Sequence, residues 1–387
     1  MAVNDNLREA KKKKKDEFFT AYEVIEAEMN SYYEYDKNAF RGKTILLPCD
    51  DPEWSNFTKY FAANFERFGL KKLISTSFAK SVWNKQLTDF EKSSPAFDND
   101  KHNNNGKLFI LEKDTNNSGH IDHEDIEFSY LCGDGDFRSE EVTKLRDEAD
   151  IIITNPPFSL FRDFLAWINE ANKQFIIIGN LNALTYKEVF PLIKNNSIWL
   201  GPSIHSGDRK FYVPDTYPLD AAGCGVDGEG KRYIKVKGVR WYTNIEYGNR
   251  HDFMPLMTYD ENIKYNKKLI NRCKKDYEGS IYQKYYNYDA IEVPVSEAIP
   301  KDYYGVMGVP ISFMDKYCPE QFEILGLGIA NLGLECGVQP YTPEHKEYRK
   351  NVQHKGQVNG DLYLIDSEGH PVVPYARILI KAKGELK

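Results

Sequence analysis

Short apolar segments that alternate with amphipathic ones constrain the fold of this chain more than any other feature. The apolar segments are residues 44–48, 72–78, 128–132, 151–154 and 175–179. They are rich in Ile, Leu and Val and show no strict apolar–polar alternation, which is typical of strands buried on both faces of a parallel sheet. Helix-like stretches lie between them at residues 56–68, 139–148 and 159–169. This order predicts an α/β fold with a doubly wound, mostly parallel sheet, whose functional loops lie at the carboxyl ends of the strands.

The first 35 residues divide into a basic tail and a helix. Residues 1–15 end in five consecutive lysines, and a block of like charges predicts a disordered tail or a solvated helix start rather than a specific DNA-binding arm. Apolar side chains between residues 16 and 35 recur at spacings of three and four. This spacing predicts a helix with one buried face.

Residues 84–126 interrupt the alternation. They are polar and rich in Asn, Asp, Lys and Ser, a composition that predicts an extended hairpin or an ordered insertion rather than core. His120 and His123 stand there among acidic residues and could in principle bind a metal ion, but no further residues at ligand spacing accompany them. We therefore expect a solvated loop and no metal site.

Length and composition limit the class of protein. The 387 residues suffice for a catalytic domain at residues 16–200 and a second region at residues 201–387, where Gly, Pro, Tyr and Trp become frequent. No apolar run approaches the roughly 18 residues of a membrane helix, and no cleavable signal follows the lysines, so we expect a cytoplasmic protein without membrane contact. The six cysteines lack CxxC spacing, which argues against a zinc ribbon or a disulfide framework.

The distribution of charge is more informative than its sum. A net charge of -7 is unfavourable for a nucleic-acid partner, because phosphate binding calls for a positive surface. Positive charge is nevertheless concentrated in the second half of the chain. Residues 231–240 contain five basic residues and no acidic one, and six more basic residues lie between positions 264 and 275.

The turn Asn155-Pro156-Pro157-Phe158 directly follows the segment 151–154, at the carboxyl end of a predicted strand, where α/β enzymes bind ligands. Two consecutive prolines fix two φ angles and remove two N–H donors, so the carbonyl groups of the turn are held as rigid acceptors. An exocyclic aromatic amine is a poor nucleophile because its lone pair is delocalised into the ring. The Asn155 side-chain oxygen and the Pro156 carbonyl could accept its two N–H groups and make the lone pair available.

Phe158 offers a flat apolar face to the base that carries this amine. A base within a duplex reaches such a pocket only when it is flipped out of the stack. The pattern predicts an enzyme that modifies an amino group, with a proline-rich turn that merely ends a strand as the structural alternative. The turn alone does not identify the acceptor, since similar turns occur in enzymes that methylate guanine N2 in RNA or a glutamine amide in proteins.

With these elements in order, the sequence resembles the EcoRI-type adenine-specific DNA methyltransferases of restriction–modification systems. The resemblance covers most of the chain and rests on residues 155–158 together with the segments 16–20, 49–52, 133–138, 178–182, 239–244 and 307–313. It implies a Rossmann-like, seven-stranded methyltransferase sheet, a C-terminal mixed α+β target-recognition region and S-adenosylmethionine as the methyl donor. The implied reaction transfers the methyl group to the N6 amino group of a flipped-out adenine in duplex DNA.

The resemblance also implies a set of donor-binding residues. They are Phe19, Thr20, Asp50, Asp51, Asp134, Asp136 and Phe137. The first two match the motif that covers the methionine part of the donor, and the next two follow the first strand, where a carboxylate suits the donor's ammonium group. The last three lie in the element that contacts the donor adenine. A solvated turn residue is the alternative for each acid.

Two departures from the wider methyltransferase pattern leave the details of donor binding open. The usual glycine-rich loop after the first strand is absent, and residues 50–56 stand in its place. Ser75-Thr76-Ser77 follows the second strand, where an acidic ribose ligand is often found. The EcoRI-type family shares the first departure.

Basic residues of the C-terminal region are the candidates for DNA contacts, because they can bind both phosphates and base edges. They are Lys231, Arg232, Lys235, Arg240, Arg250 and His251. An exposed solubilising face is the alternative for any one of them. We expect a monomer that acts on double-stranded DNA. It would be either the modification enzyme of a restriction–modification system, with no stable complex between it and a cognate restriction endonuclease, or a phage or solitary relative without such a counterpart.

Two other functions remain open at this point. An RNA guanine-N2 methyltransferase would use the same turn, and a catalytically silent DNA-binding relative would keep the fold. The family resemblance argues against the RNA substrate. The intact 155–158 turn argues against the silent relative, since a protein without catalysis has no need of carbonyl groups aimed at an amine.

Overall fold

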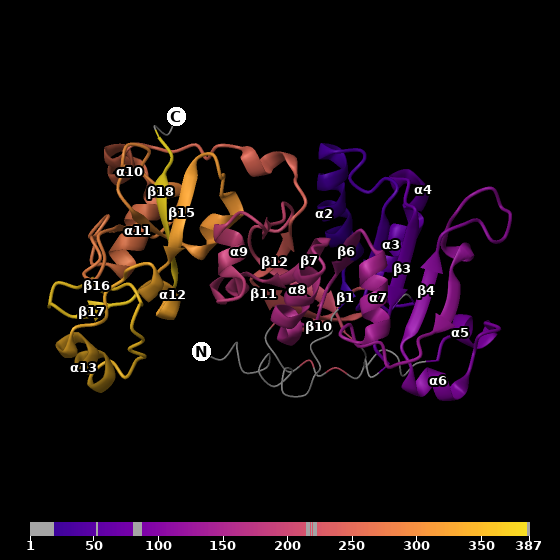
Figure 1. The fold of residues 1–387 in the computed structure, drawn as a ribbon. Coiled ribbons are helices and arrows are strands. Elements are labelled where there is room, and N and C mark those ends of the chain that lie inside the picture. Colours follow the sequence, from indigo (N-terminus) through magenta and orange to yellow (C-terminus); the bar gives the residue numbers. More distant parts are fainter. Residues whose placement is uncertain are drawn as a thin grey trace. The chain divides into compact units, whose positions relative to one another are not determined.

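A computed structural model describes residues 19–51, 53–79, 87–213, 217, 219 and 223–384. The predicted basic tail at residues 1–15 lies outside these residues. The chain forms two compact units, one of Met1–Asn180 with Leu200–Gly248 and the other of Leu181–Trp199 with Asn249–Lys387 (Figure 1). Residues 201–248, which the sequence placed in the target-recognition region, thus pack with the first unit. The functional division at residue 200 stays a prediction.

A large mixed sheet forms the centre of the first unit. Its strands are β2 (Thr44–Leu47), β3 (Lys72–Thr76), β4 (Lys107–Leu111), β5 (Glu127–Tyr130), β6 (Ile151–Thr154), β7 (Gln174–Asn180), β8 (Trp199–Leu200) and β12 (Val239–Thr243). Their order is β5-β4-β3-β2-β6-β7-β12-β8. All five apolar segments predicted to be strands are confirmed as strands of this sheet.

The sheet differs from the prediction in strand number and direction. It has eight strands instead of seven, and its central strands β3, β2, β6 and β7 run parallel. β4 runs antiparallel to β3, and β12 runs antiparallel to β7. β4 lies within the predicted insertion at residues 84–126, so part of that polar segment belongs to the sheet. β4 and β12 each follow a long connection and pair with an edge of the parallel part of the sheet. Such long-range pairing cannot be recognised from the local pattern of apolar residues.

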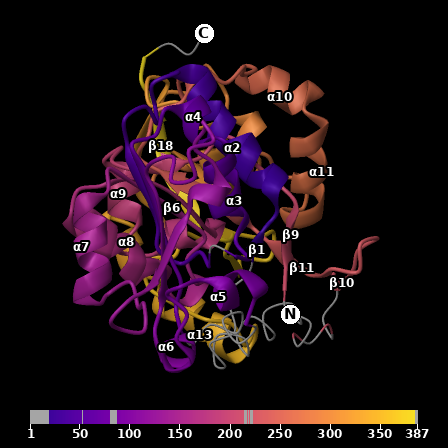
Figure 2. The same ribbon diagram turned by 90° about the vertical axis from the view of Figure 1, so that its right-hand side faces the viewer.

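Helices cover both faces of the sheet. They are α2 (Tyr22–Tyr35), α3 (Asn56–Ala63), α4 (Phe65–Phe68), α5 (Asp89–Ser93), α6 (Asn99–Asn104), α7 (Glu140–Glu148) and α8 (Phe161–Glu170). Figure 2 shows α7 and α8 on one side of the strands and α2 and α3 on the other. Ile151 and Ile153 share a core cluster with Ile25 of α2, and Ile152 between them is equally buried. Burial on both faces explains why these strands lack alternation.

A second, four-stranded sheet corrects the prediction of one helix over residues 16–35. The helix α2 begins at Tyr22, and Phe19–Thr20 forms strand β1. β1 pairs antiparallel with β9 (Asp208–Tyr212), and the sheet order is β1-β9-β11-β10, with β10 at Gly225–Val226 and β11 at Arg232–Lys237. Pairing with a distant strand outweighs the helical spacing of the first apolar residues.

The second unit contains two smaller sheets and five helices within the described residues. One sheet has the order β13-β14-β18-β15, and the other pairs β16 with β17. The strands are β13 (Ile291–Glu292), β14 (Met307–Pro310), β15 (Phe322–Leu327), β16 (Leu364–Ile365), β17 (Pro371–Val372) and β18 (Arg377–Ala382). The helices are α9 (Phe190–Lys194), α10 (Tyr259–Tyr265), α11 (Lys267–Asp276), α12 (Ala330–Glu335) and α13 (Pro343–Asn351). Across the part of the chain that the structure describes, no helix has the length and apolarity needed to cross a membrane.

A buried glutamate of α2 fixes this helix in the first unit. Glu28 is fully buried, and its carboxylate accepts hydrogen bonds from the Tyr32 hydroxyl at 2.7 Å and from the Ser203 backbone N–H at 2.9 Å. A Cβ atom at Gly201 would lie 2.0 Å from Glu28 Oε1, so the carboxylate occupies space that only glycine leaves free. Burial raises the pKa of Glu28 to about 7, against the lowering effect of its hydrogen bonds.

We expect Glu28→Gln to stabilise the protein at pH 8 and to have little effect at pH 5. Because the folded-state pKa lies above the ordinary value of 4.5, the contribution of Glu28 to stability is fully present below pH 4.5 and is lost as the pH rises through about 7. Gln cannot ionise, so the gain at pH 8 should be about 2 kcal/mol. Urea unfolding at both pH values measures it. Glu26→Gln, at an exposed position of the same helix, is the control, and an equal effect of Glu28→Gln at both pH values would contradict this account.

Candidate active site

A buried carboxylate joins the carboxyl ends of two central strands. Asp50 lies three residues after β2 and is 3% exposed. Its Oδ2 accepts a hydrogen bond from the Thr154 hydroxyl at 2.6 Å, and its Oδ1 accepts one from the Ser55 hydroxyl at 2.7 Å. Thr154 ends β6 and immediately precedes Asn155. Asp50 therefore fixes the point from which the 155–158 turn starts.

Burial raises the pKa of Asp50 to about 7, and its hydrogen bonds from Thr154 and Ser55 oppose this rise. The Ser75 hydroxyl, at the end of β3, donates a hydrogen bond to the Asp50 carbonyl at 2.6 Å and lies 2.9 Å from the Thr58 hydroxyl. Ser75 belongs to the segment Ser75-Thr76-Ser77, which stands where an acidic ribose ligand is often found. Its hydroxyl thus links the turn after β2 to β3 and α3.

The proline turn leads from β6 into a helical segment. Asn155 is half-buried, Pro156 is buried and Pro157 is extended, with φ −53° and ψ 124°. The Pro157 carbonyl accepts a hydrogen bond from the Leu160 N–H at 2.9 Å, which closes the 3₁₀ turn η2 (Phe158–Leu160) ahead of α8. The turn is therefore held on one side by Thr154 and on the other by α8.

The N-terminal strand β1 reaches this turn through β9. Thr20 pairs with Phe211 of β9, and the Phe211 ring meets the Phe158 ring edge-on, with centroids 6.4 Å apart. The Asn56 side-chain amide donates to the Thr20 carbonyl at 2.7 Å. Thr20 is 3% exposed, and its hydroxyl has no hydrogen-bond partner among the described residues. The structure thus brings Thr20 and Phe158, two predicted site residues far apart in the sequence, to one place.

Asp51 differs from its neighbour Asp50 in its contacts. It is 4% exposed, and its Oδ1 accepts a hydrogen bond from the Glu53 N–H at 3.0 Å. Its Oδ2 lies 3.7 Å from the Lys107 Nζ atom and accepts no hydrogen bond from any described residue. Burial raises the pKa of Asp51 to about 6, and the charge of Lys107 counteracts this rise.

The segment 133–138 packs against the end of β3 through two glycines. A Cβ atom at Gly135 would lie 2.1 Å from the Ser77 carbonyl oxygen, and one at Gly106 would lie 2.5 Å from the same atom. The Ala79 N–H donates to the Asp134 carbonyl at 2.8 Å. The close approach places Asp134 and the following residues beside the β3 end, at the same sheet edge as Asp50.

Asp136 and Phe137 have partners within the protein. Asp136 is bound by the Arg138 guanidinium, with Nε at 2.9 Å from Oδ1 and Nη2 at 2.6 Å from Oδ2. Phe137 is 4% exposed, and its ring lies 5.0 Å from Phe164 and 5.5 Å from Trp167 of α8. Their roles toward the adenine of a methyl donor stay predictions.

Sequence reasoning missed several residues of this site. Thr154, Ser55 and Lys107 hold the predicted aspartates, and none was selected from the sequence. Thr154 could have been found as the residue between a buried strand and the proline turn. Lys107 gave no local signal, because its partners lie far from it in the sequence.

Three predicted DNA contacts lie on or beside β11. Lys235 is exposed on this strand, whose buried residues Ile234 and Val236 alternate with exposed lysines. Lys231, just before the strand, is exposed and paired with Glu229 at 2.8 Å. Arg232 is half-buried, and its Nη2 donates to the Tyr217 carbonyl at 2.7 Å.

The other basic candidates have different surroundings. Arg240 of β12 is 4% exposed and donates to the Val239 carbonyl at 2.8 Å and to the His205 carbonyl. In the second unit, Arg250 is 4% exposed, and its guanidinium carbon lies 3.6 Å from the centroid of the Trp199 ring. His251 of the same unit is exposed and lies 2.9 Å from the Glu320 carboxylate. Burial gives both arginines a structural contribution, and their DNA contacts remain predictions.

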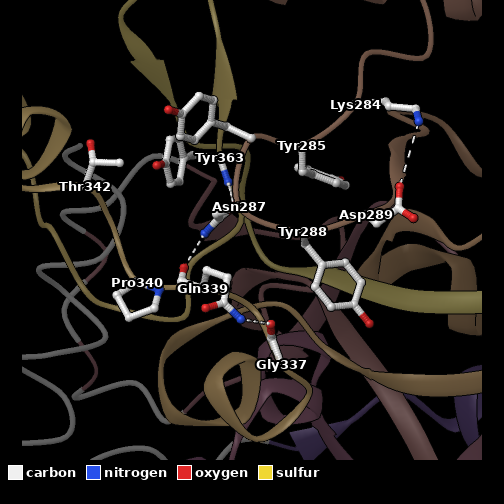
Figure 3. A pocket seen from close by; sticks show the side chains of 11 residues that line it. Lys284, Tyr285, Asn287, Tyr288, Asp289, Gly337, Gln339, Pro340, Thr342 and Tyr363 are labelled. Atoms are coloured by element: carbon white, nitrogen blue, oxygen red, sulfur yellow. Dashed lines mark hydrogen bonds and ion pairs between the residues drawn. The ribbon is translucent and has the colours of Figure 1, made fainter.

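Among the described residues His120 and His123 form no metal centre, and a groove of the second unit is lined by residues other than the predicted ones. Within the described ranges no group of His, Cys, Asp and Glu could hold a metal ion, and His120 and His123 are exposed. An open groove of about 590 Å³ lies in the second unit, lined in part by Tyr285, Tyr288 and Tyr363 (Figure 3). None of the predicted site residues lines this groove.

Comparisons with known proteins agree over nearly the whole chain. A family model described as adenine-specific methyltransferase EcoRI matches residues 6–383. The chain is 40% identical to the type II methyltransferase M.EcoRI of Escherichia coli over 384 residues, which cover 99% of this chain and 98% of that protein. It is 32% identical to the type II methyltransferase M.MpnI of Mycoplasma pneumoniae, covering 97% of each. It is 31% identical to the type II methyltransferase M.MgeORF184P of Mycoplasma genitalium, covering 87% of this chain and 88% of that protein. No solved structure matches the chain.

We expect Gly135→Ala to disrupt the 133–138 segment and Gly133→Ala to be tolerated. Gly135 has a φ of +79°, and its added Cβ would collide with the Ser77 backbone, so strain and overpacking should together cost roughly 2–4 kcal/mol. Gly133 has no atom within 4 Å of its Cβ position, and its substitution should change stability by about 0.5 kcal/mol or less. Urea unfolding of both variants measures the difference, and equal stability of the two would contradict the close packing.

Proposed function

Because this chain belongs to the EcoRI family of adenine-specific methyltransferases, we propose that it transfers a methyl group from S-adenosylmethionine to the N6 amino group of adenine in duplex DNA. The family resemblance stated from the sequence is confirmed, and the chain is an adenine-specific DNA methyltransferase of the restriction–modification type. The position of the 155–158 turn supports the proposal that the methyl transfer takes place there. The 155–158 turn starts at Thr154, which Asp50 holds, and lies beside β1 through the contact of Phe158 with Phe211.

The residues around Thr20 and Asp51 fit S-adenosylmethionine. Both side chains are buried, and each keeps an oxygen atom without a hydrogen-bond partner among the described residues. Burying such an atom costs free energy unless a ligand satisfies it. The Thr20 hydroxyl would donate to the donor's carboxylate, and Asp51 Oδ2 would accept from its ammonium group. Asp50 already accepts two hydrogen bonds within the protein, so Asp51 is the better ligand of the two.

The adenine end of the donor belongs, in this proposal, at the 133–138 segment. Asp136 would accept a hydrogen bond from the donor's amino group, and Phe137 would contribute apolar surface beside the ring. Asp134 lies in the same segment, which Gly135 holds against the end of β3. When bound, the donor supplies an activated methyl group on a sulfonium centre.

The protein's own contribution to the reaction is orientation and polarisation of the acceptor amine. The Asn155 side-chain oxygen and the Pro156 carbonyl accept the two N–H groups of the amine, which directs its lone pair out of the ring plane. The prolines keep these acceptors rigid, and the Thr154–Asp50 hydrogen bond at 2.6 Å anchors them to the sheet. The extra proton on nitrogen can leave after transfer, so no strong base is required.

Phe158 and β11 bind different parts of the DNA. Phe158 stacks on the flipped base, because a base inside the duplex cannot reach the turn. The exposed lysines of β11 bind phosphates next to it, since β11 pairs with β9, and Phe211 of β9 contacts Phe158. We further propose a monomeric enzyme that forms no stable complex with an endonuclease, as each strand of a palindromic site can be methylated in turn.

The test of this function is incubation with S-adenosylmethionine labelled in its methyl group and unmethylated DNA, followed by digestion to nucleosides. We expect label in N6-methyldeoxyadenosine. Asn155→Ala should lower the transfer rate at least 100-fold, because polarisation of the amine is lost, while donor affinity changes less than about threefold. Transfer of label to RNA but not to DNA would overturn the assignment. Donor binding lost together with transfer in Asn155→Ala would indicate a structural turn instead.

Charge removal at β11 should weaken DNA binding. Lys231→Gln and Lys235→Gln should each lower the slope of log affinity against log salt concentration by about 0.9, the value for one lost phosphate contact. Lys144→Gln is the matched control, since Lys144 is exposed and paired with Glu140 at 2.8 Å, as Lys231 is with Glu229. DNA titrations at several salt concentrations measure the slopes. Equal slopes for all three variants would show that the DNA-binding surface does not include Lys231 and Lys235.

A further inference from the structure

A fully buried lysine lies among three carboxylates next to the proposed donor site. Lys107 is the first residue of β4 and is 1% exposed. Its Nζ atom lies 2.6 Å from Glu53 Oε2, 3.0 Å from Glu91 Oε2 and 3.7 Å from Asp51 Oδ2. Glu91 is completely buried. A lysine is almost never this buried unless it is paired, and here one ammonium group is shared by three acids.

The segment that the sequence marked as an insertion supplies most of this cluster. Glu91 of α5 contacts His102 of α6, with Nδ1 2.8 Å from Oε1, and receives a hydrogen bond from the Tyr130 hydroxyl at 2.5 Å. The Thr88 hydroxyl contacts Glu53 Oε1. The cluster therefore connects α5, α6, β4 and β5 to the turn after β2.

The charges of the cluster are not balanced within the protein. One ammonium group, that of Lys107, faces the three carboxylates of Asp51, Glu53 and Glu91. Burial alone would lower the pKa of Lys107, but Asp51 and Glu53 raise it above its ordinary value, so the ammonium group stays charged. The excess negative charge suits a second cation at Asp51 Oδ2, which accepts no hydrogen bond from the described residues.

We propose that Lys107 is a positioning residue for the methyl donor: it holds Asp51 beside Glu53 and keeps it ionised, so that Asp51 Oδ2 can bind the donor's ammonium group. This inference rests on the proposed donor site. It also assigns a role to α5 and α6, because Glu91 of α5 binds the lysine and is itself held by His102 of α6. Lys107 itself makes no contact with the donor in this account.

The titration of Asp51 makes the proposal measurable. The groups that act on Asp51 are Asp50, Glu53, Lys59, Glu91 and Lys107, with His102 and Tyr130 behind Glu91. The pKa of Asp51 is about 6 with Lys107 present, since burial raises it and Lys107 lowers it. Donor affinity of the natural protein should therefore fall as the pH drops through about 6.

The experiment measures binding of S-adenosylmethionine to the full-length protein by calorimetry between pH 5 and pH 9. Lys107→Met should shift the midpoint of the affinity profile upward by about two pH units, because an uncompensated Asp51 holds its proton more tightly, and should therefore lower affinity about tenfold at pH 7. Glu53→Gln should shift the midpoint downward, since it removes a negative charge beside Asp51. Lys72→Met is the control, because Lys72 is a largely buried lysine of β3 paired with Glu148 at 2.7 Å, and it should leave the midpoint unchanged.

A second probe separates positioning from mere support of the fold. 5′-Methylthioadenosine has the adenosine and sulfur of the donor but lacks its amino-acid part, so Lys107→Met should change its affinity less than twofold. An equal loss of affinity for both compounds, or midpoints that do not move in Lys107→Met and Glu53→Gln, would overturn the proposal while leaving the donor site intact. Absence of S-adenosylmethionine binding by the natural protein would instead refute the proposed function itself, and this inference with it.

Discussion

The hydrogen bond between Thr154 and Asp50 is the interaction on which the arrangement of the site depends. It joins the end of β6 to the turn after β2, two neighbouring strands whose carboxyl ends meet at one edge of the sheet. The other Asp50 oxygen binds Ser55, the N-cap residue of α3, and the next residue, Asn56, holds the Thr20 carbonyl. One carboxylate thus connects the turn proposed to receive the amine with the strand proposed to cover the donor. Burial of the Asp50 carboxylate costs free energy because the carboxylate loses its hydration. Its short hydrogen bonds from Thr154 and Ser55 offset this cost and hold the strand ends in one arrangement.

The sequence was sufficient for the central strands because burial on both faces leaves a continuous apolar signature. Ile151 to Ile153 show it most clearly: all three are fully buried, against helices on alternate sides. The two strands β4 and β12 were not recognised as parts of the main sheet, because each reaches it after a long connection and pairs antiparallel at its edge. β4 also begins with a lysine, and its core role depends on acids supplied by other elements. In β1, Phe19 and Thr20 fitted a helical spacing, and only their pairing with β9 makes them a strand.

The site shows the same division between local and tertiary information. The proline turn could be recognised from four residues because its chemistry is local: fixed φ angles, missing donors and an aromatic ring. The donor residues came from resemblance, and the structure gives them individual surroundings that resemblance does not. Phe137 packs between Phe164 and Trp167, and Asp136 is held by Arg138. Lys107 could not be found from the sequence at all, since Glu53 and Glu91 approach it only in the folded chain.

Asp50 and Asp51 show how two adjacent, equally buried acids come to differ in their surroundings. The two carboxylates have different neighbours: that of Asp50 accepts hydrogen bonds from the hydroxyls of Thr154 and Ser55, and that of Asp51 lies near the ammonium group of Lys107. Neutral hydroxyl donors satisfy Asp50 in either protonation state, because a protonated carboxyl can donate to a hydroxyl oxygen in turn. Asp51 has no such partners, and its ionisation depends on nearby positive charge. The first residue can therefore serve the fold at any physiological pH, whereas the second is suited to a cationic ligand, whose positive charge would add to that of Lys107.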